Sequence, residues 1–490
     1  MRVLRPTMTL AVTLSLALAC ATTPPKADPP PSEEKAAPKA EDWRNERPKP
    51  GPTPKLELPK FEQATLDNGL TILVSHRPGL PLVSMQVAIR GGSAAEAKGK
   101  AGLADLTYEL MLEGAGQRDA LALADAFADL GTQASVGTGS DGVTIGLSVL
   151  TRNVDAALAL LSDVIQRPKL EQADFDRKQN ERLADLARLA GEPKYLGGIA
   201  FAAEVYGADH PYGHPGMGTP ETVAGFTLDD AKAFHKARVG PANAAFIAAG
   251  DVTLEQTKAW AQAHFGAWSA TVEPPPAVPA PEVSPRARIL VVPKEGLAQT
   301  VVAVGRPGIE AGHADEWALR MSGVLFGGFF GSRLNMNLRE DKGYTYGARA
   351  SVSTPKGVGT VRAGASVRAD VTGPSVAEFF NELEGLKTNP LSEEELSAGR
   401  EGVIRSIPGK FETIGGLAGT AASFFLRGQP MDRLARAVKA YEGMTRAQVQ
   451  AMVEKYYDPA VMRIVLVGDP KIIEEQVGAL KIGELVTVKP

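Results

Sequence analysis

The sequence predicts an α+β protein with two homologous domains, each a largely antiparallel sheet flanked by helices. The first observation behind this prediction is an internal repeat, because residues 226–251 align without a gap to residues 444–469 at an offset of 218. In both copies a segment with helical periodicity leads through a proline, Pro241 or Pro459, into an apolar run that ends at Gly-Asp. The second observation is that helical and strand-like segments are mixed without strict βαβ alternation, which favours antiparallel sheets.

The individual elements follow from the hydrophobic pattern of each half. Short apolar runs that stop at Gly, Pro or a charged residue are typical of buried strands, and they lie at 69–76, 83–92, 244–251, 287–294, 300–308 and 462–469. Longer stretches with apolar residues at a 3.6-residue period predict helices at 121–130, 153–165 and 175–189.

The domain organisation is read from composition. A chain of 490 residues is too long for one ordinary core, and a Pro-rich stretch divides it into halves of similar size. We predict a signal peptide (1–20), a disordered Pro-rich tether (21–60), a first domain (61–270), a Pro-rich linker (271–288), a second domain (289–475) and a C-terminal tail (476–490).

The N-terminus has the features of an export signal. Arg2 and Arg5 precede an apolar stretch that is too short to span a bilayer, and the stretch ends in "LALAC" at Cys20. Cys20 is the only cysteine of the chain, so it excludes an intramolecular disulfide. Its position resembles a bacterial lipobox, which implies lipidation of the thiol and an anchor on a membrane facing the periplasm. Ala21 after the cysteine favours the outer membrane as the site of the anchor. The alternative to lipidation is an ordinary signal peptide in which the cysteine is incidental.

Composition excludes some function classes. The chain is 44% hydrophobic and 22% charged, as globular proteins are, and its net charge is −4. Such a chain offers no broad basic field for a nucleic acid. We therefore expect no nucleic-acid partner.

One helix has the form of a metal-binding helix without its metal ligands. The stretch "GLADLTYELMLEG" (102–114) places apolar residues at helical spacing and ends at Gly114, which we interpret as its C-cap. It resembles the zinc motif His-x-x-Glu-His of the pitrilysin and insulinase-like metallopeptidases, a family that includes the mitochondrial processing peptidase. The family's Gly-Leu-Ala triplet is intact, but Asp105, Tyr108 and Glu109 stand where the resemblance implies the two histidines and the general base.

Other residues could in principle hold a metal. Asp105 and Glu109 are four apart on one helix face and would suit Ca²⁺, Mg²⁺ or Mn²⁺ better than zinc, although such pairs are usually a solvated face. The resemblance places the third ligand near 180–186, where Glu181 and Asp185 are candidates. His210 and His214 have ligand spacing, but Pro211 and Gly213 between them predict a turn.

The second half keeps a different motif of the same family. Its segment 325–353 contains the Gly-rich loop "GGFFG". The loop is followed by Ser-Arg-Leu, Leu-Arg-Glu and Gly-x-x-Tyr, and the order of these three motifs resembles that of the family. The resemblance implies that the Arg and Tyr of this motif stabilise the substrate carbonyl as charge develops on it. The matching residues are Arg339 and Tyr346, and the loop glycines are Gly327, Gly328 and Gly331. The alternative is that Arg339 pairs with Glu340 or Asp341 and that Tyr346 packs on a sheet.

This asymmetry predicts a division of labour between two chains. We expect a metal-free, Arg/Tyr-bearing subunit of a heterodimeric zinc peptidase, inactive alone, whose zinc is bound by a family homologue as partner and whose substrates are periplasmic peptides. A peptide-binding or scaffolding protein without catalysis is the alternative, and the Gly-rich loop would suit it. An autonomous peptidase that uses Asp105 and Glu109 with another metal ranks last.

Overall fold

The structure is a computed structural model that describes residues 56–282 and 287–488, all of which belong to one compact unit beginning at Thr53. The predicted signal peptide, the lipidation site Cys20 and the tether up to residue 55 lie outside the described residues. Leu56 and Leu58 fall at the end of the predicted tether, yet they pack against Ile407 and Phe424. Residues 56–60 therefore belong to the folded unit.

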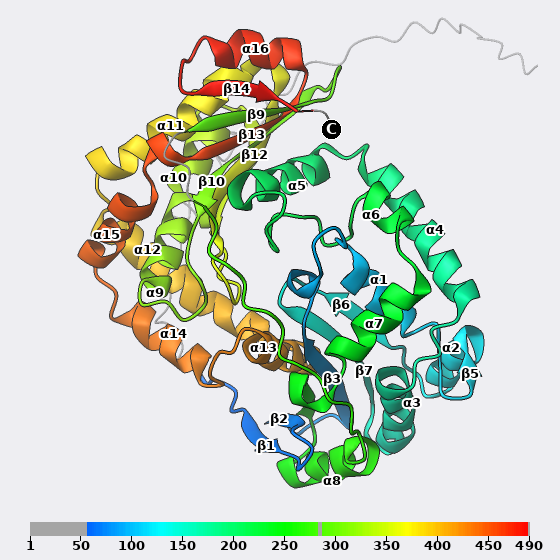
Figure 1. Ribbon diagram of the computed structural model, residues 1–490. Coiled ribbons are helices and arrows are strands. Elements are labelled where there is room, and N and C mark those ends of the chain that lie inside the picture. The colour runs from blue at the N-terminus through cyan, green and yellow to red at the C-terminus, as the bar shows by residue number, and fades with distance from the viewer. Residues whose placement is uncertain (1–55, 283–286, 489–490) are drawn as a thin grey trace, which may run out of the picture. The chain divides into compact units, whose positions relative to one another are not determined.

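Two six-stranded sheets organise the described part of the chain (Figure 1). Both are mixed but largely antiparallel, and the parallel pairs are β2–β8, β13–β9 and β14–β9. The first sheet has the order β1-β2-β8-β3-β7-β6, with strands Glu62–Thr65, Thr71–His76, Ala244–Gly250, Leu82–Arg90, Gly142–Leu150 and Ser135–Thr138. The second has the order β11-β12-β10-β13-β9-β14, with strands Thr345–Val352, Thr360–Arg368, Gln299–Pro307, Arg463–Gly468, Arg288–Pro293 and Glu484–Thr487.

The internal repeat appears in the structure as equivalent elements, and the predicted fold class is confirmed. In each half a capped helix leads through a 3₁₀ turn that begins at a proline into a strand at the centre of the sheet. The elements are α7 (Leu228–Arg238), Pro241–Asn243 and β8 in the first copy, and α15 (Arg446–Tyr456), Pro459–Val461 and β13 in the second.

Apart from Arg463 at the start of β13, these central strands are apolar because both of their faces are buried. In β8, Phe246 and Ala248 face the core of the first half, while Ala245, Ile247 and Ala249 face a different cluster. Successive side chains of a strand point to opposite faces, so each face needs its own cover.

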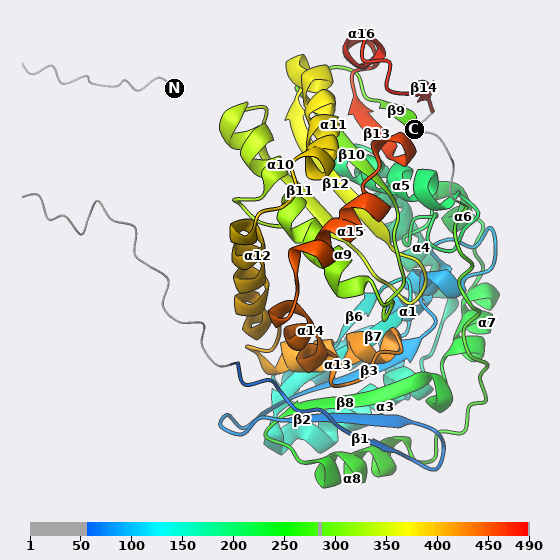
Figure 2. The ribbon, with the colours of Figure 1, turned by 90° about the vertical axis from the view of Figure 1, so that its left-hand side faces the viewer.

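The face of each central strand that points away from the core of its own half is covered by a helix from the other half. Helix α5 (Pro193–Tyr206) packs on β10 and β13 of the second sheet, and α13 (Ile414–Leu426) packs on β3 and β8 of the first (Figure 2). At the repeat offset of 218, α5 corresponds to residues 411–424, so the two exchanged helices occupy equivalent places in the repeat. The exchange holds the two halves in one compact unit.

The remaining helices agree with the periodic pattern. The three predicted helices are present as α2 (Ala120–Asp129), α3 (Val154–Gln166) and α4 (Gln172–Leu189).

Helix α1 (Leu103–Leu110) ends four residues before Gly114, and its C-cap is Met111 in a right-handed conformation. The interpretation of Gly114 as the cap is therefore wrong, because Gly114 instead begins β4 (Gly114–Ala115) and pairs with Asp119. Helices of the second half that matter below are α9 (Glu316–Gly323), α12 (Glu393–Ser406) and α14 (Arg433–Glu442).

The predicted tail and linker differ from the observed boundaries. The predicted tail contains the end of α16 (Pro470–Gly478) and strand β14, which pairs in parallel with β9. Of the predicted linker, residues 271–282 have neither helix nor strand, whereas Arg288 already belongs to β9. Within the described residues, no helix is both long and apolar enough to cross a bilayer.

Candidate functional site

Helix α1 keeps the family's Gly-Leu-Ala triplet for reasons of backbone geometry. Gly102 is its N-cap residue with φ 95°, and a Cβ atom there would lie 2.6 Å from the carbonyl oxygen of Met217 and 2.7 Å from Gly218 Cα. Only glycine combines that left-handed conformation with so close an approach. Gly102 is therefore required by the fold whether or not a metal is bound.

Tyr108 stands at the general-base position and belongs to the core. It is fully buried, its hydroxyl donates to the Gly91 carbonyl at 2.8 Å, and its ring meets Phe234 edge-on with 5.8 Å between centroids. Burial raises the pKa of this phenol. A neutral, hydrogen-bonded, water-free phenol cannot act as a base on a bound water.

Arg182 occupies the space between Asp105 and Glu109, the two carboxylates at the positions that the resemblance assigns to histidines. It projects from α4, its side chain is 4% exposed, and its two terminal nitrogens each lie 2.9 Å from an acid, one from Asp105 and the other from Glu109. The guanidinium also donates to the Met217 carbonyl at 3.4 Å. One internal cation thus pairs with both acids of the helix face.

The residues present do not fit a zinc ion. Carboxylates that already bind a guanidinium are not free to coordinate a metal, and a second cation would be repelled by Arg182. Burial raises the pKa of Glu109, and Arg182 opposes that rise. The same contacts argue against a harder metal at Asp105 and Glu109.

The predicted third-ligand candidates point elsewhere. Glu181 pairs with Arg177 at 2.8 Å and Lys178 at 3.3 Å, and Asp185 pairs with Arg188 at 3.4 Å. Over the ranges 56–282 and 287–488 there is no group of three or more His, Cys, Asp or Glu side chains that could hold a metal. The functional residue in this window is Arg182, which sequence reasoning missed although it lies between the two candidates.

Glu96 is a second residue that the sequence did not reveal. Its side chain is fully buried and accepts hydrogen bonds from the backbone N–H groups of Gly102 at 3.1 Å and Ala104 at 2.7 Å, at the start of α1. Burial raises the pKa of this carboxyl to about 8 despite those hydrogen bonds. Glu96 fixes the entry of the chain into α1.

The two histidines of "HPYGH" lie in a turn, as predicted. Nε2 of His210 donates to the Pro279 carbonyl at 3.0 Å, while its Nδ1 accepts from the Tyr212 backbone N–H at 3.0 Å. His214 has its Nδ1 3.7 Å from Glu96 Oε2, and burial lowers its pKa. Neither ring shares a site with the other.

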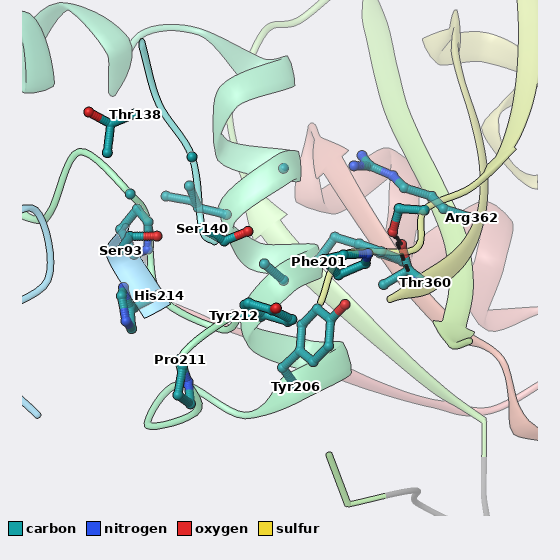
Figure 3. Close-up of a pocket in the computed structure, with 18 of the residues that line it drawn as sticks. Ser93, Thr138, Ser140, Phe201, Tyr206, Pro211, Tyr212, His214, Thr360 and Arg362 are labelled. Carbon is teal, nitrogen blue, oxygen red and sulfur yellow. Dashed lines mark hydrogen bonds between the residues drawn. The ribbon is translucent and has the colours of Figure 1, made fainter. Parts of the chain in front are cut away.

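A cavity of about 760 Å³ lies beside α1 and is lined by residues of both halves; we refer to it as the chamber. Figure 3 shows His214 and Arg362 on opposite sides of it, with Tyr206 and Tyr212 between them. The Tyr212 hydroxyl donates to Asp141 at 2.7 Å and accepts from the Gly357 N–H at 3.0 Å, which joins the halves at the chamber wall. The charged residues of its lining are Asp105, Arg320, Arg362 and Arg427.

The Gly-rich loop of the second half lies against strand β11. A Cβ atom on Gly327 would approach the backbone nitrogen of Ala350 to 2.4 Å, so glycine is needed there for close packing. Asn335 ties the loop to the strand, because its amide donates to the Phe330 carbonyl at 2.7 Å and its oxygen accepts from the Ala348 N–H at 3.1 Å. No sequence pattern indicated this buried role of Asn335.

Arg339 and Tyr346 follow the Gly-rich loop in the sequence, and neither residue lines the chamber. The Arg339 guanidinium lies over the Phe330 ring at 4.9 Å and 3.2 Å from Glu340, and its side chain is 42% exposed. The local pair with Glu340 that the alternative interpretation requires is present. Tyr346 does not pack on the sheet, since it is 90% exposed.

Exposed apolar side chains gather on the same stretch of chain. Among the described residues, four of the six large hydrophobic side chains that are exposed fall between positions 329 and 346, namely Phe329, Phe330, Met336 and Tyr346. Three of these four residues are aromatic, and we refer to the four together as the aromatic face. Exposed apolar side chains gathered in this way are typical of an interaction surface.

The comparison with protein families agrees with this architecture. The model described as "Insulinase (Peptidase family M16)" matches residues 71–202, and that described as "Peptidase M16 inactive domain" matches residues 225–403. The chain belongs to the insulinase-like M16 peptidase family. The first match contains α1 and Arg182, and the second contains Arg339 and Tyr346.

Relatives and solved structures extend the match. The chain is similar to an uncharacterized zinc protease of Mycobacterium leprae (28% identity over 58% of this chain and 64% of the relative) and to one of Rickettsia bellii (26% identity over 68% and 80%). It thus spans just under two thirds of the length of the first relative. Its fold is similar to that of an M16 inactive domain from Pseudomonas fluorescens (TM-score 0.78, 23% identity, 84% of this chain and 98% of that one). It is also similar to the first half of the periplasmic protease PqqL from Escherichia coli (TM-score 0.70, 15% identity, 86% and 96%).

Proposed function

We propose that this chain is the metal-free, Arg/Tyr-bearing subunit of a heterodimeric zinc peptidase that acts on peptides in the periplasm. The observation that carries the proposal is Arg182, which binds both carboxylates at the positions of the zinc ligands and leaves no room for a metal there. The chain is then inactive alone. Its zinc-bearing partner is a homologue of the same family.

The position of Arg339 and Tyr346 supports completion of a site between two chains. Both are solvent-exposed, and neither shares a cavity lining with Asp105 of the same chain. A guanidinium and a phenol are donors suited to an oxyanion that forms outside the chain. The aromatic face around them offers apolar surface that a partner would bury.

A lipid on Cys20 would hold the complex at a membrane facing the periplasm, and the Pro-rich segment after it would provide reach. This part of the proposal depends on the N-terminal sequence alone. It is tested by mass spectrometry of the mature protein, in which a lipidated N-terminal cysteine is the expected product.

The test of the activity is peptide hydrolysis by the purified chain alone and together with the zinc-motif homologue that co-purifies with it. Activity is expected only in the pair. Arg339→Ala should lower turnover of the pair by about 100-fold, the typical loss for one oxyanion donor, without changing its zinc content. Arg368→Ala, which removes an exposed arginine paired with Asp370, is the control and should leave turnover unchanged.

Unchanged turnover in Arg339→Ala would refute the role given to this residue. A peptide-binding or scaffolding protein is the second candidate, and the exposed Phe329 and Phe330 on the Gly-rich loop favour it. That candidate is distinguished by peptide binding without hydrolysis in both preparations.

A further inference from the structure

A second cavity, of about 430 Å³, lies in the second half between α9, α13 and α14. Four basic residues line it, namely Arg320, Lys410, Arg427 and Arg433, and we refer to it as the cationic cavity. No aspartate or glutamate is among the described residues of its lining. Such a concentration of one charge sign around a small cavity favours an anionic ligand.

The carboxylate of Glu316, which does not line the cavity, balances only part of this positive charge. Glu316 is 1% exposed and pairs with both Arg320, at 2.9 Å, and Arg433. The structure gives no partner, among the residues it describes, for the Arg427 guanidinium or the Lys410 ammonium. Crowding of the Lys410 ammonium by protein atoms, followed by repulsion from the three arginines, lowers its pKa.

The lining of the cationic cavity also includes large apolar side chains. These are Trp317, Phe424 and Leu434, and the Trp317 ring contacts Tyr441 edge-on and the Arg433 guanidinium at 4.7 Å. Gly419 of α13 faces the space, since a Cβ atom there would have no heavy atom within 4 Å. The cavity therefore fits an anionic group attached to an apolar group.

The cationic cavity and the chamber share two wall residues, Arg320 and Arg427. The two cavities are therefore neighbours on either side of these arginines. The chamber lining itself has three arginines and one carboxylate, that of Asp105. A chain-like anion long enough to pass these arginines would contact both linings.

We propose that the cationic cavity binds the C-terminal carboxylate and the last apolar side chain of a peptide that extends into the chamber. The inference rests on the proposed function only for the choice of a peptide as ligand. Arg427 and Lys410 provide the free charges for the carboxylate. Trp317 and Phe424 provide the surface for the apolar side chain.

The test is fluorescence anisotropy with the purified chain and an N-terminally labelled Gly-Ser-Gly-Ala-Leu peptide carrying an uncharged fluorophore. The peptide with a free carboxylate should bind at least about tenfold more tightly than its C-terminal amide, because charge-assisted hydrogen bonds are lost in the amide. Arg427→Gln and Lys410→Gln should each remove most of this difference. Arg436→Gln, which changes an exposed arginine of α14 paired with Asp432, is the matched control and should leave it intact.

Gly419→Leu provides a variant that keeps all four charges. A Cβ atom at this position would have no heavy atom within 4 Å, and the longer side chain would occupy cavity space, so the variant should weaken binding of the free-acid peptide while thermal unfolding shows a folded protein. Equal binding of the free acid and the amide would overturn the proposal. So would displacement of the peptide by inorganic phosphate at the peptide's own concentration, which would indicate a site for small anions. Because the isolated chain is used and no turnover is measured, failure here is distinct from failure of the heterodimer proposal.

Discussion

Arg182 and Asp105 form an ion pair of 2.9 Å in which the arginine side chain is 4% exposed. The same guanidinium binds Glu109, so one residue of α4 pairs with both acids on this face of α1. It also ties two helices that are distant in sequence.

Replacement of Arg182 should be costly. Arg182→Met leaves two partly buried carboxylates without their counter-ion, and we expect a loss of about 3–5 kcal/mol in the free energy of unfolding at pH 8. In the variant the pKa of Glu109 should rise further, so the deficit should shrink as the pH falls and the acids are protonated. Urea denaturation at pH 8 and pH 5.5 measures both effects, with Arg188→Met, an exposed arginine of the same helix, as control. A deficit that does not depend on pH would contradict this account.

The titration of Glu96 should make the protein less stable as the pH rises. Its carboxyl has a pKa of about 8 when folded and an ordinary value of 4.5, so the folded state retains a proton that the unfolded state releases between these values. Stability should therefore fall as the pH rises from 4.5 to 8. Glu96→Gln removes this titration and still offers an oxygen to the Gly102 and Ala104 N–H groups. We expect it to be more stable than the parent at pH 8, by roughly 1 kcal/mol or more, with a smaller difference near pH 5. Thermal unfolding across this range is the measurement, and a constant difference would argue against a titrating Glu96.

The Gly-rich loop should not tolerate a side chain at Gly327. Gly327→Val places a Cβ atom against the Ala350 backbone, and we expect a loss of about 1–3 kcal/mol from overpacking. Gly331→Ala is the control in the same loop, because its Cβ atom would meet only the ring of Phe329, which is partly exposed and can move. Chemical denaturation of the two variants checks the difference. Equal stability would mean that the loop can move away from β11.

The aromatic face should matter for association and little for folding. Phe330 is 57% exposed, so Phe330→Ser should change the free energy of unfolding by about 0.5 kcal/mol at most. We expect it to weaken association with the zinc-bearing partner by roughly tenfold or more, because exposed aromatic residues are common binding anchors. Analytical ultracentrifugation of the two chains checks this. Leu121→Ser, at a residue of the first half that is 72% exposed, is the control, and an equal effect of both changes would exclude a specific face.

How much of this could be predicted from the sequence depends on whether the signal is local. The repeat of 226–251 and 444–469 predicted equivalent helices and central strands, because helical period and buried apolar runs are properties of neighbouring residues. The absence of histidines at positions 105 and 109 was equally visible. The roles of Arg339 and Tyr346 in catalysis stay a prediction that rests on the family motif.

The position of Arg182 between Asp105 and Glu109 could be learned only from the folded structure. Arg182 lies 77 residues beyond Asp105, and only the packing of α4 against α1 brings its guanidinium between two acids. The exchange of α5 and α13 has the same origin, since a strand that is apolar on both faces requires a cover without specifying which half provides it. The family, the repeat and the absence of histidines at positions 105 and 109 could be predicted from the sequence alone, because these depend on residue type and spacing. Charge compensation and the cover of buried faces depend on distances between remote side chains, and those are set only when the chain folds.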